Sequence, residues 1–168
     1  MKRSLPPPLM LSFSTPLRPQ SHALMGLALD HAVNTPPGDV PVGAIVLDER
    51  GEVIGRGVNR READADPLAH AEMLAIRQAL GKTGDGWRFS RCTLVVTLEP
   101  CAMCAGAIMG ARMGRLVFGA FEPKTGACGS ALDVVRDPLA LHTMEVIGGV
   151  RERECAALME EFFRGLRG

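Results

Sequence analysis

Short apolar runs alternate with helical segments through most of this chain, and this alternation limits the folds that it can adopt. Runs of aliphatic and β-branched residues predict five strands, at 42–47, 52–58, 93–98, 115–119 and 144–147. Strands that alternate with helices predict an α/β fold, a three-layer α/β/α sandwich in which helices cover both faces of the sheet. The turn at 48–51 joins the first two strands as a hairpin, so we expect a mixed five-stranded sheet.

Helical periodicity and capping signals predict the helices between these strands. Helices are expected to begin at Ser21, Asp66, Pro100 and Ser130. The second of them is expected to end near Leu80, and the third near Ala111. The last segment is the clearest helix, with one apolar stripe that we expect to face the core: Cys155, Leu158, Met159, Phe162, Phe163 and Leu166.

The first 20 residues differ in composition from the rest of the chain. They contain five prolines and no acidic residue. This composition predicts a disordered leader at 1–20 more readily than a targeting segment, although an organellar transit role stays open. Residues 21–168 are then long enough for one domain.

Charge and cysteine content narrow the classes of protein that this chain can belong to. The formal net charge is zero, so any nucleic-acid site must be a local basic patch. No apolar run approaches the roughly 18 residues that a membrane span needs. Five cysteines, an odd number, are typical of a reduced, cytoplasmic protein rather than of a disulfide scaffold.

Two short motifs carry side chains that can bind a metal or transfer a proton. The triplet His70-Ala71-Glu72 is weak evidence by itself, because such triplets arise by chance on helical surfaces. Cys101 and Cys104 lie three apart in a predicted helix, where both sulfurs can bind one ion. Taken alone, the two cysteines could also be a redox pair, two buried small hydrophobic residues, or part of a closed structural zinc site completed by Cys92 or Cys128.

The two motifs together favour a catalytic zinc site. His70, Cys101 and Cys104 supply three protein ligands and leave one tetrahedral position open for water. Zinc lowers the pKa of such a water toward neutrality. Glu72 stands beside a ligand without being needed to bind the ion, so its carboxylate can transfer the proton of the water to a substrate. This combination is the signature of the zinc-dependent deaminases.

Longer stretches resemble the bacterial tRNA-specific adenosine deaminases (TadA type) of the cytidine-deaminase-like superfamily. The resemblance extends from about Ser21 to Arg164 and includes the segments 40–44, 57–60, 66–72, 96–107, 114–120, 124–127, 154–158 and 162–164. The Lys-Thr-Gly-Ala segment at 124–127 and the Phe-Phe-Arg segment at 162–164 point to the tRNA branch. The resemblance implies the cytidine-deaminase-like fold, one zinc ion per subunit and a homodimer. It also implies that the wobble adenosine of a tRNA anticodon stem-loop is converted to inosine.

The resemblance further implies two substrate-binding residues. Asn59 matches an asparagine that contacts the base, and its amide can both donate and accept hydrogen bonds. Its alternative role is that of an ordinary turn residue. Lys124 falls in an RNA-facing loop, and its alternative is a solvated lysine. Phe162 and Phe163 could border the RNA, but their helical stripe favours the core. A carboxylate at Glu99 is accounted for by the dipole of the helix that follows it.

Two other functions stay open from the sequence. A deaminase of a free base or nucleotide, such as guanine or cytosine, would share the zinc motif, and zero net charge would suit it. A zinc-stabilised binding module without turnover is the second alternative. Glu72 argues against that module, because a structural site does not need an unligated carboxylate beside the ion.

Overall fold

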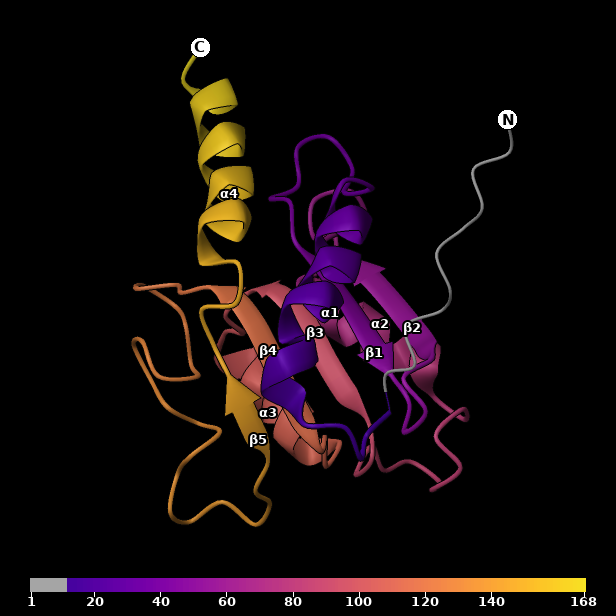
Figure 1. Ribbon diagram of the computed structural model, residues 1–168. Helices are drawn as coiled ribbons and strands as arrows, with labels where there is room; N and C mark the ends of the chain where they lie inside the picture. The colour runs from indigo at the N-terminus through magenta and orange to yellow at the C-terminus, as the bar shows by residue number, and fades with distance from the viewer. Residues whose placement is uncertain (1–11) are drawn as a thin grey trace, which may run out of the picture.

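A mixed sheet of five strands, in the order β2-β1-β3-β4-β5, forms the centre of the computed structural model, which describes residues 12–168 (Figure 1). The strands are β1 (Gly43–Leu47), β2 (Val53–Val58), β3 (Thr93–Leu98), β4 (Arg115–Ala120) and β5 (Glu145–Ile147). β1 is antiparallel to β2 and β3, whereas β3, β4 and β5 run parallel. Every predicted strand is present within one residue of its predicted bounds, and the mixed sheet is confirmed.

Helices cover both faces of this sheet, which confirms the three-layer arrangement. They are α1 (Leu17–Ala32), α2 (Ala71–Ala79), α3 (Ala102–Gly110) and α4 (Glu152–Leu166). Within residues 12–168, no helix is long and apolar enough to cross a membrane. Figure 1 shows α1 on one face of the sheet and α2 and α3 on the other. Side chains alternate along β3, so that Leu94 and Val96 pack in the core beneath α2 and α3, while Val95 packs with α1 and α4 on the opposite face.

A close approach between α2 and β2 fixes where α2 begins. Gly57 lies under the first turn of α2, and a Cβ atom at this position would collide with the carbonyl oxygen of Ala71. Glycine lets the two backbones touch, because no side chain separates them. The N-terminus of α2, and with it His70, is thereby held against the end of β2.

The first helix begins four residues earlier than the sequence indicates, at Leu17 rather than Ser21. Pro19 lies in its first turn, where a missing N–H costs nothing because such groups have no partner within the helix. Leu17 is buried in the core. The predicted disorder of 1–20 therefore does not extend to residues 17–20, and residues 1–11 lie outside the described part of the chain.

Two further predicted helix starts, at Asp66 and Ser130, are also wrong. Asp66 lies within the loop between β2 and α2, where its carboxylate accepts a hydrogen bond from the N–H of Leu68 at 2.9 Å, and α2 starts only at Ala71. Ser130 begins no helix, because both its amide and its hydroxyl donate to the distant carboxylate of Glu99. Asp66 thus makes the bond of a helix cap without a helix following it directly, whereas the hydroxyl of Ser130 that would cap a helix is taken up by Glu99.

The apolar stripe of α4 is only partly covered, so the prediction that all of it faces the core is wrong. Cys155 is buried, but Phe162 is half-buried, and Phe163 and Leu166 are 43% and 65% exposed. Figure 1 shows the reason: α4 meets the sheet with its first turns and then projects beyond the body of the molecule.

Candidate active site

The side chains selected from the sequence meet beyond the carboxyl ends of β3 and β4. His70 is the residue before α2 and Cys101 is the residue before α3, and both have extended backbone, with ψ of 152° and 175°. Cys104 follows in the first turn of α3. Two helix N-termini therefore point at the same place, where their dipoles favour negatively charged groups such as thiolates.

His70, Cys101 and Cys104 are positioned to form a metal site. Their ligand atoms all lie within 4.8 Å of one another. The Nδ1 atom of His70 lies 3.6 Å from Sγ of Cys101 and 3.5 Å from Sγ of Cys104, so Nδ1 is the nitrogen that faces the sulfurs. One nitrogen and two sulfurs suit a tetrahedral zinc ion with its fourth position open. Among the described residues, neither Cys92 nor Cys128 joins this group, which counts against a closed structural site.

The two thiols of this group differ in their pKa values. Hydrogen bonds to Cys104 and then to His70 lower the pKa of Cys101 to about 3. The same bond between the two sulfurs raises the pKa of Cys104 above its ordinary value, and burial adds to that rise. A metal ion that takes both sulfurs as thiolates must therefore displace the proton of Cys104.

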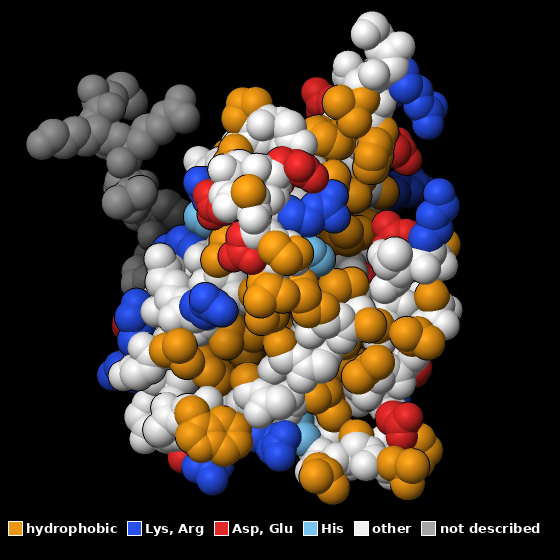
Figure 2. Space-filling view, turned by 180° about the vertical axis from the view of Figure 1, so that it is seen from behind, with side chains coloured by type: hydrophobic (Ala, Val, Ile, Leu, Met, Phe, Trp, Pro, Cys, Tyr) orange, Lys and Arg blue, Asp and Glu red, His pale blue; other side chains and the backbone are white. Residues whose placement is uncertain are grey.

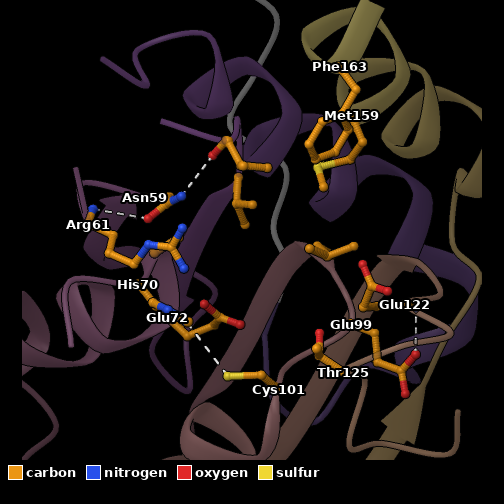
Figure 3. A pocket seen from close by; sticks show the side chains of 14 residues that line it. Asn59, Arg61, His70, Glu72, Glu99, Cys101, Glu122, Thr125, Met159 and Phe163 are labelled. Carbon is orange, nitrogen blue, oxygen red and sulfur yellow. Dashed lines mark hydrogen bonds between the residues drawn. The ribbon is translucent and has the colours of Figure 1, made fainter. Parts of the chain in front are cut away.

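Glu72 lies in the first turn of α2 and is 5% exposed. Burial raises its pKa to about 7, so this carboxyl group can both take up and release a proton near neutral pH. Figure 3 shows the Glu72 side chain at the bottom of a pocket, near His70 and Cys101. It is not part of the three-residue metal group, which leaves it available for proton transfer.

A cavity of about 230 Å³ opens above these residues. It is smaller than the roughly 300–1,000 Å³ of most sites for drug-sized ligands and suits a single planar base. Its other walls come from the segments before β1 and after β2, the end of β3, the loop after β4 and the helix α4 (Figure 3). Their lining residues are Val40, Val42, Asn59, Arg61, Leu98, Glu99, Glu122, Thr125, Met159 and Phe163.

The two predicted substrate-binding residues differ in their positions. Asn59 lines the cavity, and its amide is oriented by its own chain: Nδ2 donates to the carbonyl of Val40 at 3.0 Å, and Oδ1 accepts from the N–H of Arg61 at 3.2 Å. One amide hydrogen and one acceptor lone pair are left for a ligand. Lys124 lies outside the cavity, exposed on the loop after β4, while the adjacent Thr125 lines it.

Sequence reasoning missed several lining residues. Arg61 and Thr125 each stand within two positions of a residue that it selected, so this proximity was the available signal. Met159 was assigned to the core, against which it also packs. For Phe163 the core was preferred to the border of an RNA site, because helical periodicity identifies an apolar face but not what covers it. In the structure both side chains reach over the cavity from α4 (Figure 3).

The carboxylate of Glu99 bonds to the loop after β4. Burial acts to raise the pKa of Glu99, but hydrogen bonds from Ser130 and from the amides of Glu122 and Cys128 outweigh it, and the pKa lies below its ordinary value. The helix dipole is therefore not the main partner of this charge.

We expect the purified protein to bind one zinc ion per chain. Cys104→Ala removes one of three ligands and should weaken zinc binding by more than the roughly 10–100-fold typical of losing an outer partner. Cys92→Ala is the matched control, because Cys92 is also buried but lies outside the metal group. Elemental analysis of both variants, with circular dichroism to verify folding, measures the effect. Full zinc content in Cys104→Ala would show that Cys104 is not a ligand. A fourth protein ligand such as Cys128, found in a structure with zinc bound, would contradict an open position.

Comparison with known proteins agrees with this geometry. A family model described as the cytidine and deoxycytidylate deaminase zinc-binding region matches residues 18–120. The chain is 45% identical over 130 residues to a protein of Bacillus subtilis named tRNA-specific adenosine deaminase, a match that covers 77% of this chain and 80% of that protein.

Solved structures show the same likeness. A structure from work on A-to-I editing by tRNA:A34 deaminases has a TM-score of 0.75 and 40% identity, covering 81% of this chain and 98% of that one. A guanine deaminase of Nitrosomonas europaea has a TM-score of 0.69 and 27% identity, covering 90% and 95%. The chain belongs to the zinc-binding cytidine and deoxycytidylate deaminase family and, within it, to the tRNA-specific adenosine deaminases.

Proposed function

We propose that this protein is a zinc-dependent hydrolase that converts the wobble adenosine of a tRNA anticodon to inosine. One observation carries the proposal: a cavity the size of one base brings the three-ligand metal group, the buried Glu72 and the oriented amide of Asn59 together. The identity of 45% to a tRNA-specific adenosine deaminase supports adenosine in tRNA as the substrate. The weaker likeness to a guanine deaminase makes a free base the second candidate.

The reaction replaces the amino group of the base by the oxygen of water, and ammonia leaves. His70, Cys101 and Cys104 would hold a zinc ion, which would lower the pKa of a water molecule and so provide a nucleophile at neutral pH. Glu72 takes the proton of the attacking water and delivers it to the departing amino group, a role that suits a pKa of about 7. Asn59 holds the edge of the base with its free donor and acceptor.

Loss of the Glu72 carboxylate should abolish most turnover without loss of metal. We expect Glu72→Gln and Glu72→Ala to lower kcat by roughly 10²–10⁴-fold, because a positioned proton-transfer group contributes that much. Glu122→Gln is the control, since Glu122 lines the same cavity away from the metal group and should retain most of the rate. Inosine formation under single-turnover conditions, with zinc content measured in parallel, gives the result. A near wild-type rate in either Glu72 variant would remove the residue from the mechanism.

Cations around the cavity support a polyanionic substrate. The formal net charge of the chain is zero, so affinity for RNA must come from local groups. Arg61 lines the cavity, Lys124 is exposed on the loop after β4, and Arg164 near the end of α4 and Arg167 just after it are also exposed. These basic side chains come from three different segments around or next to the opening of the cavity. Phosphates on either side of an extruded base can reach basic side chains placed in this way.

A tRNA substrate predicts that binding depends on salt. We expect the affinity for an anticodon stem-loop to fall with added salt, and Lys124→Ala to weaken binding and to reduce the salt slope by about one. Lys82→Ala is the control, because Lys82 bonds to the carbonyl of Ile54, away from the cavity. Asn59→Ala should instead lower the rate on bound stem-loop.

The same experiment separates the two candidate substrates. Free adenosine should be a poor substrate, since it lacks the remote contacts that position the base. Efficient, salt-insensitive turnover of free guanine or cytosine, with no reaction on the stem-loop, would refute the tRNA assignment and favour the free-base alternative.

We also infer that the protein works as a homodimer in the cytoplasm. Its five cysteines are free thiols, which suits a reducing compartment. The outer face of α2 and α3 supports a dimer, since half-buried or exposed apolar and small side chains gather there: Met73, Ile76, Met103, Gly106 and Ala107. Figure 2 shows hydrophobic side chains gathered across this side of the molecule, and patches of this kind mark association sites.

Sedimentation equilibrium tests the dimer directly. We expect twice the chain mass for the wild type and for Gly165→Arg, but the mass of one chain for Gly106→Arg. Both glycines lie in helices with open space around them, so neither substitution should disturb the fold. A monomeric wild type at micromolar concentration would refute the dimer.

A further inference from the structure

Glu99 is fixed between the two strands whose ends form the site. It follows β3 directly, it is 2% exposed, and its backbone N–H donates to the carbonyl of Ala120 at the end of β4 at 2.8 Å. Its carboxylate thus points from a rigid base toward the loop that follows β4. The position of this charge is set by the sheet rather than by a flexible segment.

The carboxylate accepts four hydrogen bonds from that loop. Oε2 accepts from the N–H of Glu122 at 2.9 Å and from the hydroxyl of Ser130. Oε1 accepts from the N–H groups of Cys128 and Ser130, both at 3.0 Å. A carboxylate has about four acceptor sites, so these bonds use its capacity. Glu99 therefore has no lone pair left to act as a base, and its bonds tie both ends of the segment 122–130 to one point.

The same segment is attached to the strand that leads into the metal group. The N–H of Ala127 donates to the carbonyl of Pro100 at 2.8 Å, and Gly126 forms a β-bridge with Cys101. Gly126 passes so close that a Cβ atom there would lie 2.5 Å from the carboxylate of Glu99. Thr125, which lines the cavity, and Lys124 lie between the two attached ends.

We propose that Glu99 is a positioning residue: it holds the segment 122–130 so that Thr125 and Lys124 stand at the mouth of the cavity. The inference rests on the proposed function, because it assigns these two residues to substrate binding. Charge is essential to the role, since only a carboxylate offers acceptors to three amides and a hydroxyl together. An uncharged amide of the same shape cannot satisfy them all.

The variant Glu99→Gln tests this role with almost no change in volume. Its single oxygen can serve Cys128 and Ser130, but its NH₂ group then faces the N–H of Glu122 and leaves that donor unpaired. The bond lost to Glu122 is partly buried, and an N–H left unpaired there is costly. We therefore expect KM for an anticodon stem-loop to rise about tenfold, with kcat and zinc content largely unchanged. Hydrogen exchange should become faster in 122–130 and stay slow in β3.

Two further variants complete the design. Ser130→Ala removes only the hydroxyl donor, so it should change KM and exchange in the same direction but less, and it serves if Glu99→Gln does not fold. Asp48→Asn is the matched control, because Asp48 accepts from the amides of Arg50 and Glu52, both at 2.9 Å, in the turn at the opposite end of β1. It should alter neither KM nor exchange in 122–130.

The outcomes distinguish positioning from general stability. A parallel fall in kcat and zinc content at unchanged KM would mean that Glu99 only supports the fold, and unchanged KM with unchanged exchange would mean that it does not hold the loop. Either result overturns the proposal. Failure of the tRNA assignment is recognised separately, because the wild type itself would not turn over the stem-loop. The same comparison of KM is then made with the free base that the wild type does convert.

Discussion

The site depends on one packing constraint: the N-termini of α2 and α3 lie close together beyond the ends of the central strands. His70 and Cys101 precede these two helices, and both have extended backbone there. The close packing of α2 on Gly57 and the direct passage from β3 into Cys101 set the distance between them. Because two helix dipoles end at the same place, thiolates and a nearby carboxylate can be accommodated where burial alone would oppose them.

The strands could be predicted from the sequence because their signal is local. Each is a short run of apolar residues, and burial on both faces of the sheet requires such runs. Helix starts were less predictable, since Asp66 makes the local bond of a cap inside a loop and Ser130 bonds to the distant Glu99. The stripe of α4 shows a similar limit: a sequence reveals which face is apolar, whereas the length of sheet available to cover it depends on the whole fold.

The same division applies to the site. His70, Glu72, Cys101 and Cys104 could be selected because their spacing in two helices carries the information. Glu99 could not be understood in that way, since its partners are 23 to 31 residues away along the chain. Contacts between residues so far apart in the sequence form because β3 pairs with β4, and no local sequence pattern indicates them.

The partial attachment of α4 has a consequence for how the molecule opens. All three metal-binding side chains belong to residues 70–104, whereas Met159 and Phe163 of the cavity wall belong to the last helix. Only Cys155 in that helix is buried, and segments with few buried apolar contacts are those in which local opening costs the least free energy. A displacement of α4 would therefore open one wall of the cavity while His70, Cys101 and Cys104 kept their positions.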